Sequence, residues 1–191
     1  MKEKSFEIEK DGFYGYLYSG EKKNLVVILY VDDDPKSMIG KGAVKWFVSR
    51  KINLLAMSPA PKNTGLKNIP IDHIEEAEKR HPLQEEEFIK VENIQGHLLL
   101  IGARDDAMWP TVKYIRRMLA RLEEHPHSCS VESMIFDHGT HYVLPEGIVK
   151  KILPIGVDFL LPKMFREAKG YTRECRESRI AIEKKVLELC K

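Results

Sequence analysis

The sequence predicts an α/β fold with a shortened, mainly parallel sheet that is flanked by helices and preceded by an antiparallel hairpin. Three observations lead to this fold. Short apolar runs of strand length recur along the chain. They form two successive pairs, and a segment with helical spacing lies between the two runs of each pair. A segment rich in aromatic residues precedes the first pair. Strands that are joined through a helix pair in parallel, with a right-handed crossover. With 191 residues, the chain is expected to be one domain over residues 1–191.

The N-terminal segment predicts the hairpin. Ser5–Glu9 and Phe13–Tyr18 alternate in polarity or are rich in aromatic residues, and Asp11-Gly12 lies between them. This dipeptide favours a tight hairpin turn, because both residues tolerate the positive φ angles that such a turn requires. We therefore expect the two segments to pair through a turn at Asp11-Gly12.

The first crossover unit is expected between residues 25 and 57. The run Leu25–Val31 is continuously apolar, as in strands covered on both faces, and Ile52–Met57 is a second such run. Between them, Met38–Arg50 shows the spacing of an amphipathic helix. Ser37 directly precedes this helix, so we expect its hydroxyl to cap the helix rather than to act as a nucleophile.

A second crossover unit follows after a polar segment. Leu98–Ile101 is an apolar run that Gly102 ends, and it predicts a buried strand. Val131–Phe136 predicts the next strand. Pro110 fits the first turn of the helix between them, where its missing N–H costs nothing. The apolar stripe of that helix consists of Val112, Ile115, Leu119 and Leu122. Upstream, Ile71–Arg80 predicts an acidic helix, and Leu83–Glu92 is expected to be a solvated connector.

Acidic and histidine side chains follow the two strands of this second unit. Asp105 and Asp106 come after the first strand, and His138 and His141 come after the second. In a parallel pair, both loops emerge at the same edge. A carboxylate can then hold one ring nitrogen of a histidine while the other takes a proton from a nucleophile, in the chain order of α/β-hydrolases. Alternatively, the aspartates cap the helix that starts near Trp109, and His141 is an ordinary loop histidine.

The segments GARDDAMWP and HGTHYVLPE resemble the acid and histidine loops of a known family. This family is the C-terminal domain of acyl-CoA thioesterases and bile acid-CoA:amino acid N-acyltransferases, an α/β-hydrolase related to dienelactone hydrolase. The likeness extends over Leu54–Glu78 and over a closing helix in Gly170–Lys191. It implies a truncated α/β-hydrolase-like fold. The Gly-x-x-Asp and Gly-x-His spacings imply that Asp105 is the triad acid and His141 the base, and rank the adjacent aspartate and histidine second.

The nucleophile of the family is missing. The sequence contains no Gly-x-Ser-x-Gly pentapeptide, nor its cysteine counterpart. The strands and helix that carry it would fall between Glu78 and Glu92, where the connector is too short to hold them. We therefore expect Leu25–Val31 to pair directly with Leu98–Ile101. Three aspartates also replace the glycine-rich loop that would bind an oxyanion.

The implied function is that of an acyl-CoA thioesterase or acyltransferase that keeps a triad acid and histidine without a recognisable nucleophile. Its substrate would be an acyl-CoA or another ester or thioester, if the protein is active. A non-catalytic scaffold that binds CoA thioesters needs no nucleophile and stays open as an alternative.

A signalling function is a further alternative. VVILYVDDDPKSM resembles the first strand and acidic pocket of receiver domains, and FLLPKMF resembles their lysine loop. In that case Asp32, Asp33 and Asp34 would bind Mg²⁺, and Lys163 would contact an acyl phosphate. The run Leu54–Met57 ends without the aspartate that a receiver phosphorylates, which disfavours this alternative.

Composition limits the remaining classes. The net charge is +2, and basic and acidic residues are interspersed, so nothing indicates a nucleic-acid partner. No window approaches the roughly 18 apolar residues that span a membrane, and the N-terminus is too polar for a secretion signal. We expect a cytoplasmic protein with reduced Cys129, Cys175 and Cys190 and with no metal or cofactor, while a homodimer stays open. The segment EHPHSC is expected to be a solvated turn rather than a metal site.

Overall fold

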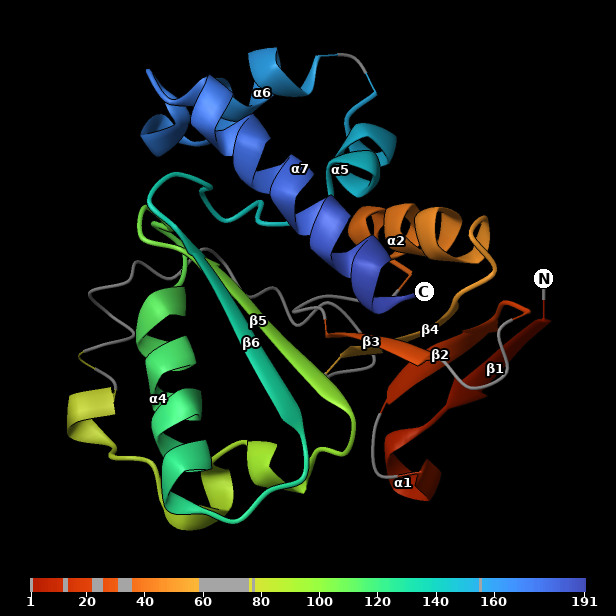
Figure 1. Ribbon diagram of the computed structural model, residues 1–191, viewed down its shortest axis with the longest axis vertical. Coiled ribbons are helices and arrows are strands. Elements are labelled where there is room, and N and C mark those ends of the chain that lie inside the picture. The colour runs from red at the N-terminus through yellow and green to blue at the C-terminus, as the bar shows by residue number, and fades with distance from the viewer. Residues whose placement is uncertain are drawn as a thin grey trace. The chain divides into compact units, whose positions relative to one another are not determined.

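The computed structural model describes residues 2–11, 14–21, 26–30, 36–58, 76, 78–154 and 156–191, which form a mixed α/β structure (Figure 1). The chain divides into two compact units. Unit 1 comprises Met1–Leu66, Leu144–Val157 and Glu183–Lys191, and unit 2 comprises Lys67–Val143 and Asp158–Ile182. The expectation of one domain over residues 1–191 stays a prediction.

Unit 1 contains a four-stranded sheet with the order β1-β2-β4-β3. Its strands are β1 (Lys2–Phe6), β2 (Tyr14–Ser19), β3 (Val26–Tyr30) and β4 (Asn53–Ser58). β1 pairs with β2 in antiparallel orientation, as the predicted hairpin requires, and β2 also pairs antiparallel with β4. Only β3 and β4 are parallel in this sheet. The prediction of a mainly parallel sheet is therefore confirmed only in part.

The predicted tight turn at Asp11-Gly12 is wrong. A short helix, α1 (Ile8–Asp11), follows β1 instead, and Gly12 lies outside the described residues. The carboxylate of Asp11 accepts a hydrogen bond from the backbone N–H of Glu7 at 2.9 Å. This bond satisfies an N–H group at the start of the helical turn, so Asp11 stabilises a helix end rather than a β-turn.

The first crossover unit is confirmed. Helix α2 (Met38–Val48) connects β3 and β4, and the Ser37 hydroxyl accepts a hydrogen bond from the backbone N–H of Gly40 at 3.3 Å, as expected for an N-cap. Trp46 and Leu54 are almost completely buried in the core of unit 1. Helix α5 (Glu146–Ile152) contributes Ile148 to the same core, although it lies about a hundred residues further along the chain.

The second crossover unit is also confirmed. β5 (His97–Ala103) and β6 (Ser130–Phe136) pair in parallel over their whole lengths, and α4 (Thr111–Glu124) connects them. They form a two-stranded sheet that β3 does not join among the described residues, so the expected direct pairing of Leu25–Val31 with Leu98–Ile101 is wrong.

The polar segment before β5 is more ordered than a solvated connector. It forms two short 3-10 turns, η1 (Glu85–Glu87) and η2 (Val91–Asn93). Val91 is 1% exposed and packs in a small core with Leu122 of α4 and Cys129. The apolar side chain within this acidic run therefore anchors the segment on α4.

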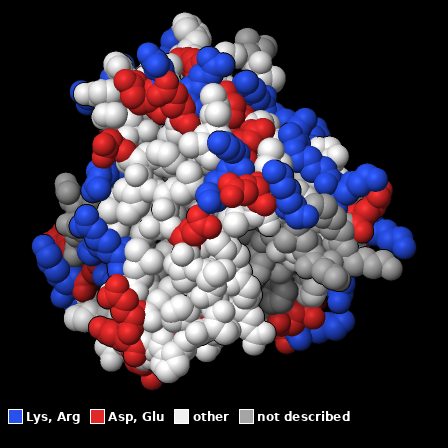
Figure 2. Space-filling model, viewed as in Figure 1, with Lys and Arg blue, Asp and Glu red and all other residues white. Residues whose placement is uncertain are grey.

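The C-terminal part of the chain is helical. Helices α6 (Val157–Met164) and α7 (Thr172–Leu189) are separated by η3 (Arg166–Ala168), and α7 confirms the predicted closing helix. Of the helix predicted at residues 71–80, the described residues 76 and 78–80 are helical. None of the described helices is both long and apolar enough to cross a membrane. On the face drawn in Figure 2, Lys and Arg lie beside Asp and Glu, and a broad area of uncharged residues separates these charged groups.

Candidate functional site

The carboxyl ends of β5 and β6 bring the acid loop and the histidine loop together in unit 2. Ala103 and Phe136 are register partners at the ends of the two strands, and the backbone N–H of Arg104 donates to the carbonyl of Phe136 at 2.8 Å. Both loops consequently leave the sheet at one edge, as the parallel pairing predicts.

The structure pairs His141 with Asp106. Nδ1 of His141 lies 3.1 Å from Oδ2 of Asp106, whose side chain is only 1% exposed. The other oxygen of this carboxylate accepts the backbone N–H groups of Met108 and Trp109 at 2.9 and 3.1 Å. One oxygen is thus fixed by the turn before α4, and the second holds the imidazole ring. Among the described residues, nothing forms a hydrogen bond with Nε2 of His141, and this side chain is 28% exposed.

Asp105 has a different set of partners. Its Oδ1 accepts the backbone N–H groups of Gly139 and Thr140 at 3.0 and 2.8 Å, and its Oδ2 lies 3.4 Å from Nδ1 of His138. Thr140 is fully buried and has a φ of 58°, which is rare for a β-branched residue. Asp105 therefore holds the backbone of the histidine loop in a strained conformation immediately before His141.

The ring of His138 packs against an aromatic side chain. Its ring stacks on the ring of Tyr171 with 3.6 Å between the centroids and an interplanar angle of 10°. The site thus places each aspartate next to one histidine, Asp105 next to His138 and Asp106 next to His141, whereas the Gly-x-x-Asp and Gly-x-His spacings favour Asp105 with His141. Only the contact between Asp106 and His141 is a hydrogen bond. A sequence signal for Asp106 exists, since a short aspartate-led turn before Trp109 commonly uses the aspartate side chain as a backbone acceptor.

The described part of the chain offers no nucleophile to His141. No serine, threonine or cysteine side chain in it forms a hydrogen bond with the ring. Two nucleophilic side chains of α7 lie near the histidine loop, but both are buried. The Ser178 hydroxyl donates to the carbonyl of Cys175 at 2.8 Å. Burial raises the pKa of Cys175 to about 11, and the charge of Asp105 acts in the same direction, so its thiol stays protonated and unreactive.

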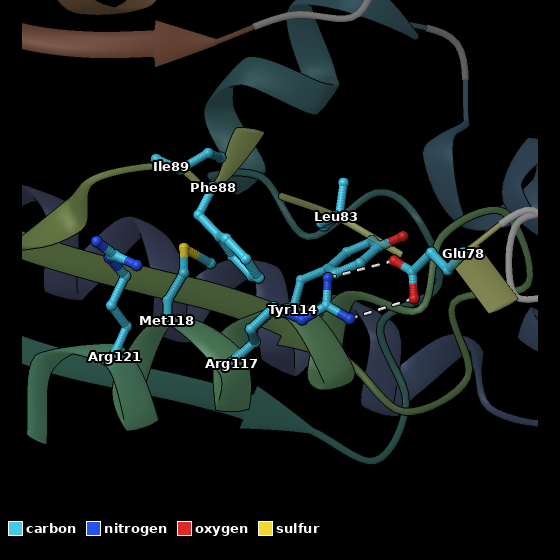
Figure 3. Close-up of a pocket in the computed structure, with 8 residues that line it drawn as sticks. All are labelled: Glu78, Leu83, Phe88, Ile89, Tyr114, Arg117, Met118 and Arg121. Carbon is cyan, nitrogen blue, oxygen red and sulfur yellow. Dashed lines mark hydrogen bonds and ion pairs between the residues drawn. The ribbon is translucent and has the colours of Figure 1, made fainter. Parts of the chain in front are cut away.

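A pocket of about 310 Å³ lies elsewhere in unit 2, between α4 and the segment before β5 (Figure 3). Leu83, Phe88 and Met118 form apolar walls. Glu78 accepts a hydrogen bond from Lys113 at 2.7 Å and two from Arg117 at 3.2 and 3.3 Å. These bonds, led by that of Lys113, lower the pKa of Glu78 to about 2. The pocket contains neither Asp106 nor His141.

The remaining candidate residues are those of the receiver-like alternative, the EHPHSC segment and the three cysteines. Asp32, Asp33 and Asp34 lie outside the described residues. The predicted lysine loop is wrong, because Lys163 lies within α6, where its ammonium group sits 3.8 Å from the centre of the Phe159 ring. In the EHPHSC segment, Nδ1 of His127 lies 3.1 Å from the carbonyl oxygen of Cys129. The described residues include no group of three or more His, Cys, Asp or Glu side chains that could hold a metal ion. All three cysteines are buried, and none of the three forms a disulfide bond.

Comparison with known proteins finds one similarity, which covers the segment that holds this site. Residues 59–146 match the family described as BAAT / Acyl-CoA thioester hydrolase C terminal. The match includes β5, α4, β6 and both loops, and it confirms the resemblance predicted from those loops. No curated protein and no solved structure matches the chain.

Proposed function

We propose, from the match of residues 59–146 to the acyl-CoA thioester hydrolase family, that this protein acts on acyl-CoA or related thioesters with His141 as general base. Asp106 would orient the ring and stabilise the imidazolium that forms. Asp105 would be a positioning residue that keeps the histidine loop in place. One observation carries the proposal: a buried carboxylate that two backbone N–H groups hold in place lies 3.1 Å from Nδ1 of His141.

Without a nucleophilic side chain, the proposed reaction is a direct attack by water. Nε2 of His141 would take a proton from a water molecule while the water oxygen forms a bond to the thioester carbonyl carbon. The carbon–sulfur bond then breaks, and the departing thiolate receives a proton from the imidazolium. The products are a carboxylic acid and free CoA thiol. An amine could replace water with the same balance, which would give an amide.

The expected rate is low. The sequence carries aspartates at positions 32–34, where related domains have a glycine-rich oxyanion loop, and it lacks the nucleophile elbow. In the serine protease template, loss of the triad leaves a residual acceleration of about 10³ to 10⁴ over water. Turnover of this order needs a sensitive assay and a matched control.

The test measures release of free thiol from acyl-CoA substrates of several chain lengths by the full-length protein. The variants are His141→Gln and Asp106→Asn, and His81→Gln serves as the control because this exposed histidine lies in the same unit. We expect thiol release that both site variants reduce and the control leaves unchanged. Release that is equal in all four proteins would refute His141 as the base.

The missing nucleophile favours a second candidate, a scaffold that binds acyl-CoA without turnover. Calorimetry with a thioether analogue of acyl-CoA, which cannot be hydrolysed, separates the two. Binding without thiol release would support the scaffold and refute the hydrolase. Absence of both binding and thiol release would refute the proposed substrate class for either candidate.

A further inference from the structure

A second group of reactive side chains lies at the other end of the β5–β6 sheet. Nδ1 of His97 is 2.8 Å from the hydroxyl oxygen of Ser130, and Nε2 of the same ring is 3.4 Å from a carboxylate oxygen of Glu132. The imidazole ring therefore lies between a hydroxyl and a carboxylate, which is the order of groups in a serine hydrolase triad.

The strand register explains this arrangement. His97 and Ser130 are partners at the first positions of β5 and β6, so their side chains lie next to each other on one face of the sheet. Glu132 is two residues further along β6 and points to the same face. Two residues of a strand cover roughly 6.6 Å, a gap that an imidazole ring with a polar contact on each side can bridge.

The contacts of Ser130 favour proton transfer to His97. Its hydroxyl is 2.8 Å from His97 Nδ1 but 3.5 Å from the carbonyl of Gly96, so the shorter contact is the better hydrogen bond. If the hydroxyl donates to Nδ1, the ring proton lies on Nε2 and faces Glu132. Ser130 is exposed, and the His97 side chain is 28% exposed, so a small reagent can reach both.

This group cannot belong to the Asp106–His141 site. β5 and β6 start at His97 and Ser130, whereas the acid and histidine loops follow the last residues of the same strands. Six residue steps of about 3.3 Å place the two ends of each strand about 20 Å apart. Ser130 is therefore not the missing partner of His141.

We propose that Ser130 is an acyl-accepting nucleophile with His97 as its general base and Glu132 orienting the ring. The Ser130 oxygen forms a bond to the carbonyl carbon of an ester, and its proton moves to Nδ1 of His97. The bond to the leaving group breaks, and the leaving group takes that proton. In the second step a water oxygen forms a bond to the carbonyl carbon of the acyl-serine while His97 takes a proton from the water. The bond to the Ser130 oxygen then breaks, that oxygen takes the proton back from His97, and the acyl group leaves as a carboxylic acid.

The substrate class is restricted to esters with a good leaving group. The backbone N–H of Ser130 donates to the carbonyl of Gly96 at 2.9 Å and cannot stabilise an oxyanion. The aryloxide of an aryl ester is a good enough leaving group to depart without that help, whereas the alkoxide of an alkyl ester and the amine of an amide are not. This inference does not depend on the function proposed for His141.

The experiment treats the full-length protein with p-nitrophenyl acetate and locates the acetyl groups by peptide mass spectrometry. The variants are Ser130→Ala, His97→Gln and Glu132→Gln, with His97→Asn as a second replacement of the base. Ser133→Ala is the matched control, because Ser133 is exposed on the same strand and alternates to the opposite face. Circular dichroism checks that each variant is folded.

We expect acetylation of Ser130 in the wild type and in Ser133→Ala. Both His97 variants should slow it by about 100-fold, the low end of a general base contribution. Ser130 acetylation no faster than that of Ser133 would overturn the proposal. Acetylation of Ser130 at an unchanged rate in the His97 variants would overturn it as well, since the hydroxyl would then react without a base.

Discussion

Replacement of Asp105 tests whether this residue holds the histidine loop by its hydrogen bonds. Asp105→Ala removes the acceptor of the Gly139 and Thr140 N–H groups, and both of these residues are buried. Asp105→Asn can keep an oxygen at the position of Oδ1, while it removes the negative charge and replaces Oδ2 with an NH2 group. The two variants therefore separate the loss of the acceptor from the loss of the charge.

The expected magnitude follows from the two bonds. A hydrogen bond to a charged group contributes about 1.5 kcal/mol at the low end, and a buried donor left without a partner is costly. Two such bonds give a loss of about 3 kcal/mol in the free energy of unfolding for Asp105→Ala. For Asp105→Asn we expect about 1 kcal/mol. At about 2 to 4 °C per kcal/mol for a chain of this length, Asp105→Ala should lower the Tm by about 6 to 12 °C.

The assay is urea unfolding followed by circular dichroism and tryptophan fluorescence, with calorimetry for Tm. Asp137→Ala is the control, because this aspartate lies in the same loop, is 80% exposed and pairs only at the surface with Arg104. We expect less than about 0.5 kcal/mol for it. Equal losses for Asp105→Ala and Asp105→Asn, or a loss for Asp105→Ala as small as the control's, would refute the structural role of Asp105.

Three further predictions concern packing, thiol reactivity and acid stability. Gly147→Ala should destabilise unit 1 by about 1 to 3 kcal/mol in urea unfolding, because a methyl group there would lie 2.2 Å from Nε1 of Trp46; an unchanged midpoint would contradict this packing. Cys175, with its pKa raised to about 11, should react with iodoacetamide at pH 8 far more slowly in the folded protein than in urea, as measured by mass spectrometry. Equal rates would show that the thiol is accessible. Glu78 has a pKa of about 2 in the folded state against 4.5 in the unfolded state, so its contribution to stability is present above pH 4.5 and is lost as the pH falls toward 2. Glu78→Gln should flatten the fall of the urea midpoint between pH 5 and pH 2, and an unchanged profile would disprove the contribution of the Lys113–Glu78 contact.

The local pattern of the sequence determined most of the elements. Continuous apolar runs predicted β3, β4 and β5, helical spacing predicted α2 and α4, and the serine before α2 predicted its cap. Each of these depends on residues within a few positions of one another. The crossover rule then fixed the parallel pairing of both strand pairs, and with it the meeting of the acid and histidine loops at one edge.

The tertiary structure alone decided which aspartate contacts which histidine. Asp105 and Asp106 are adjacent and chemically identical, so their roles depend on the groups that each side chain meets. Those groups are the N–H groups of the histidine loop for Asp105, and the turn before α4 together with His141 for Asp106. The tertiary structure also decided the placement of the segment before β5. Its many charged residues predict a solvated connector, but the buried side chain of Val91 and the ion pair between Arg121 of α4 and Glu92 hold the segment on α4. Partners that lie thirty residues away in the chain leave no periodic signal in the sequence, and only the folded chain brings them within hydrogen-bond distance.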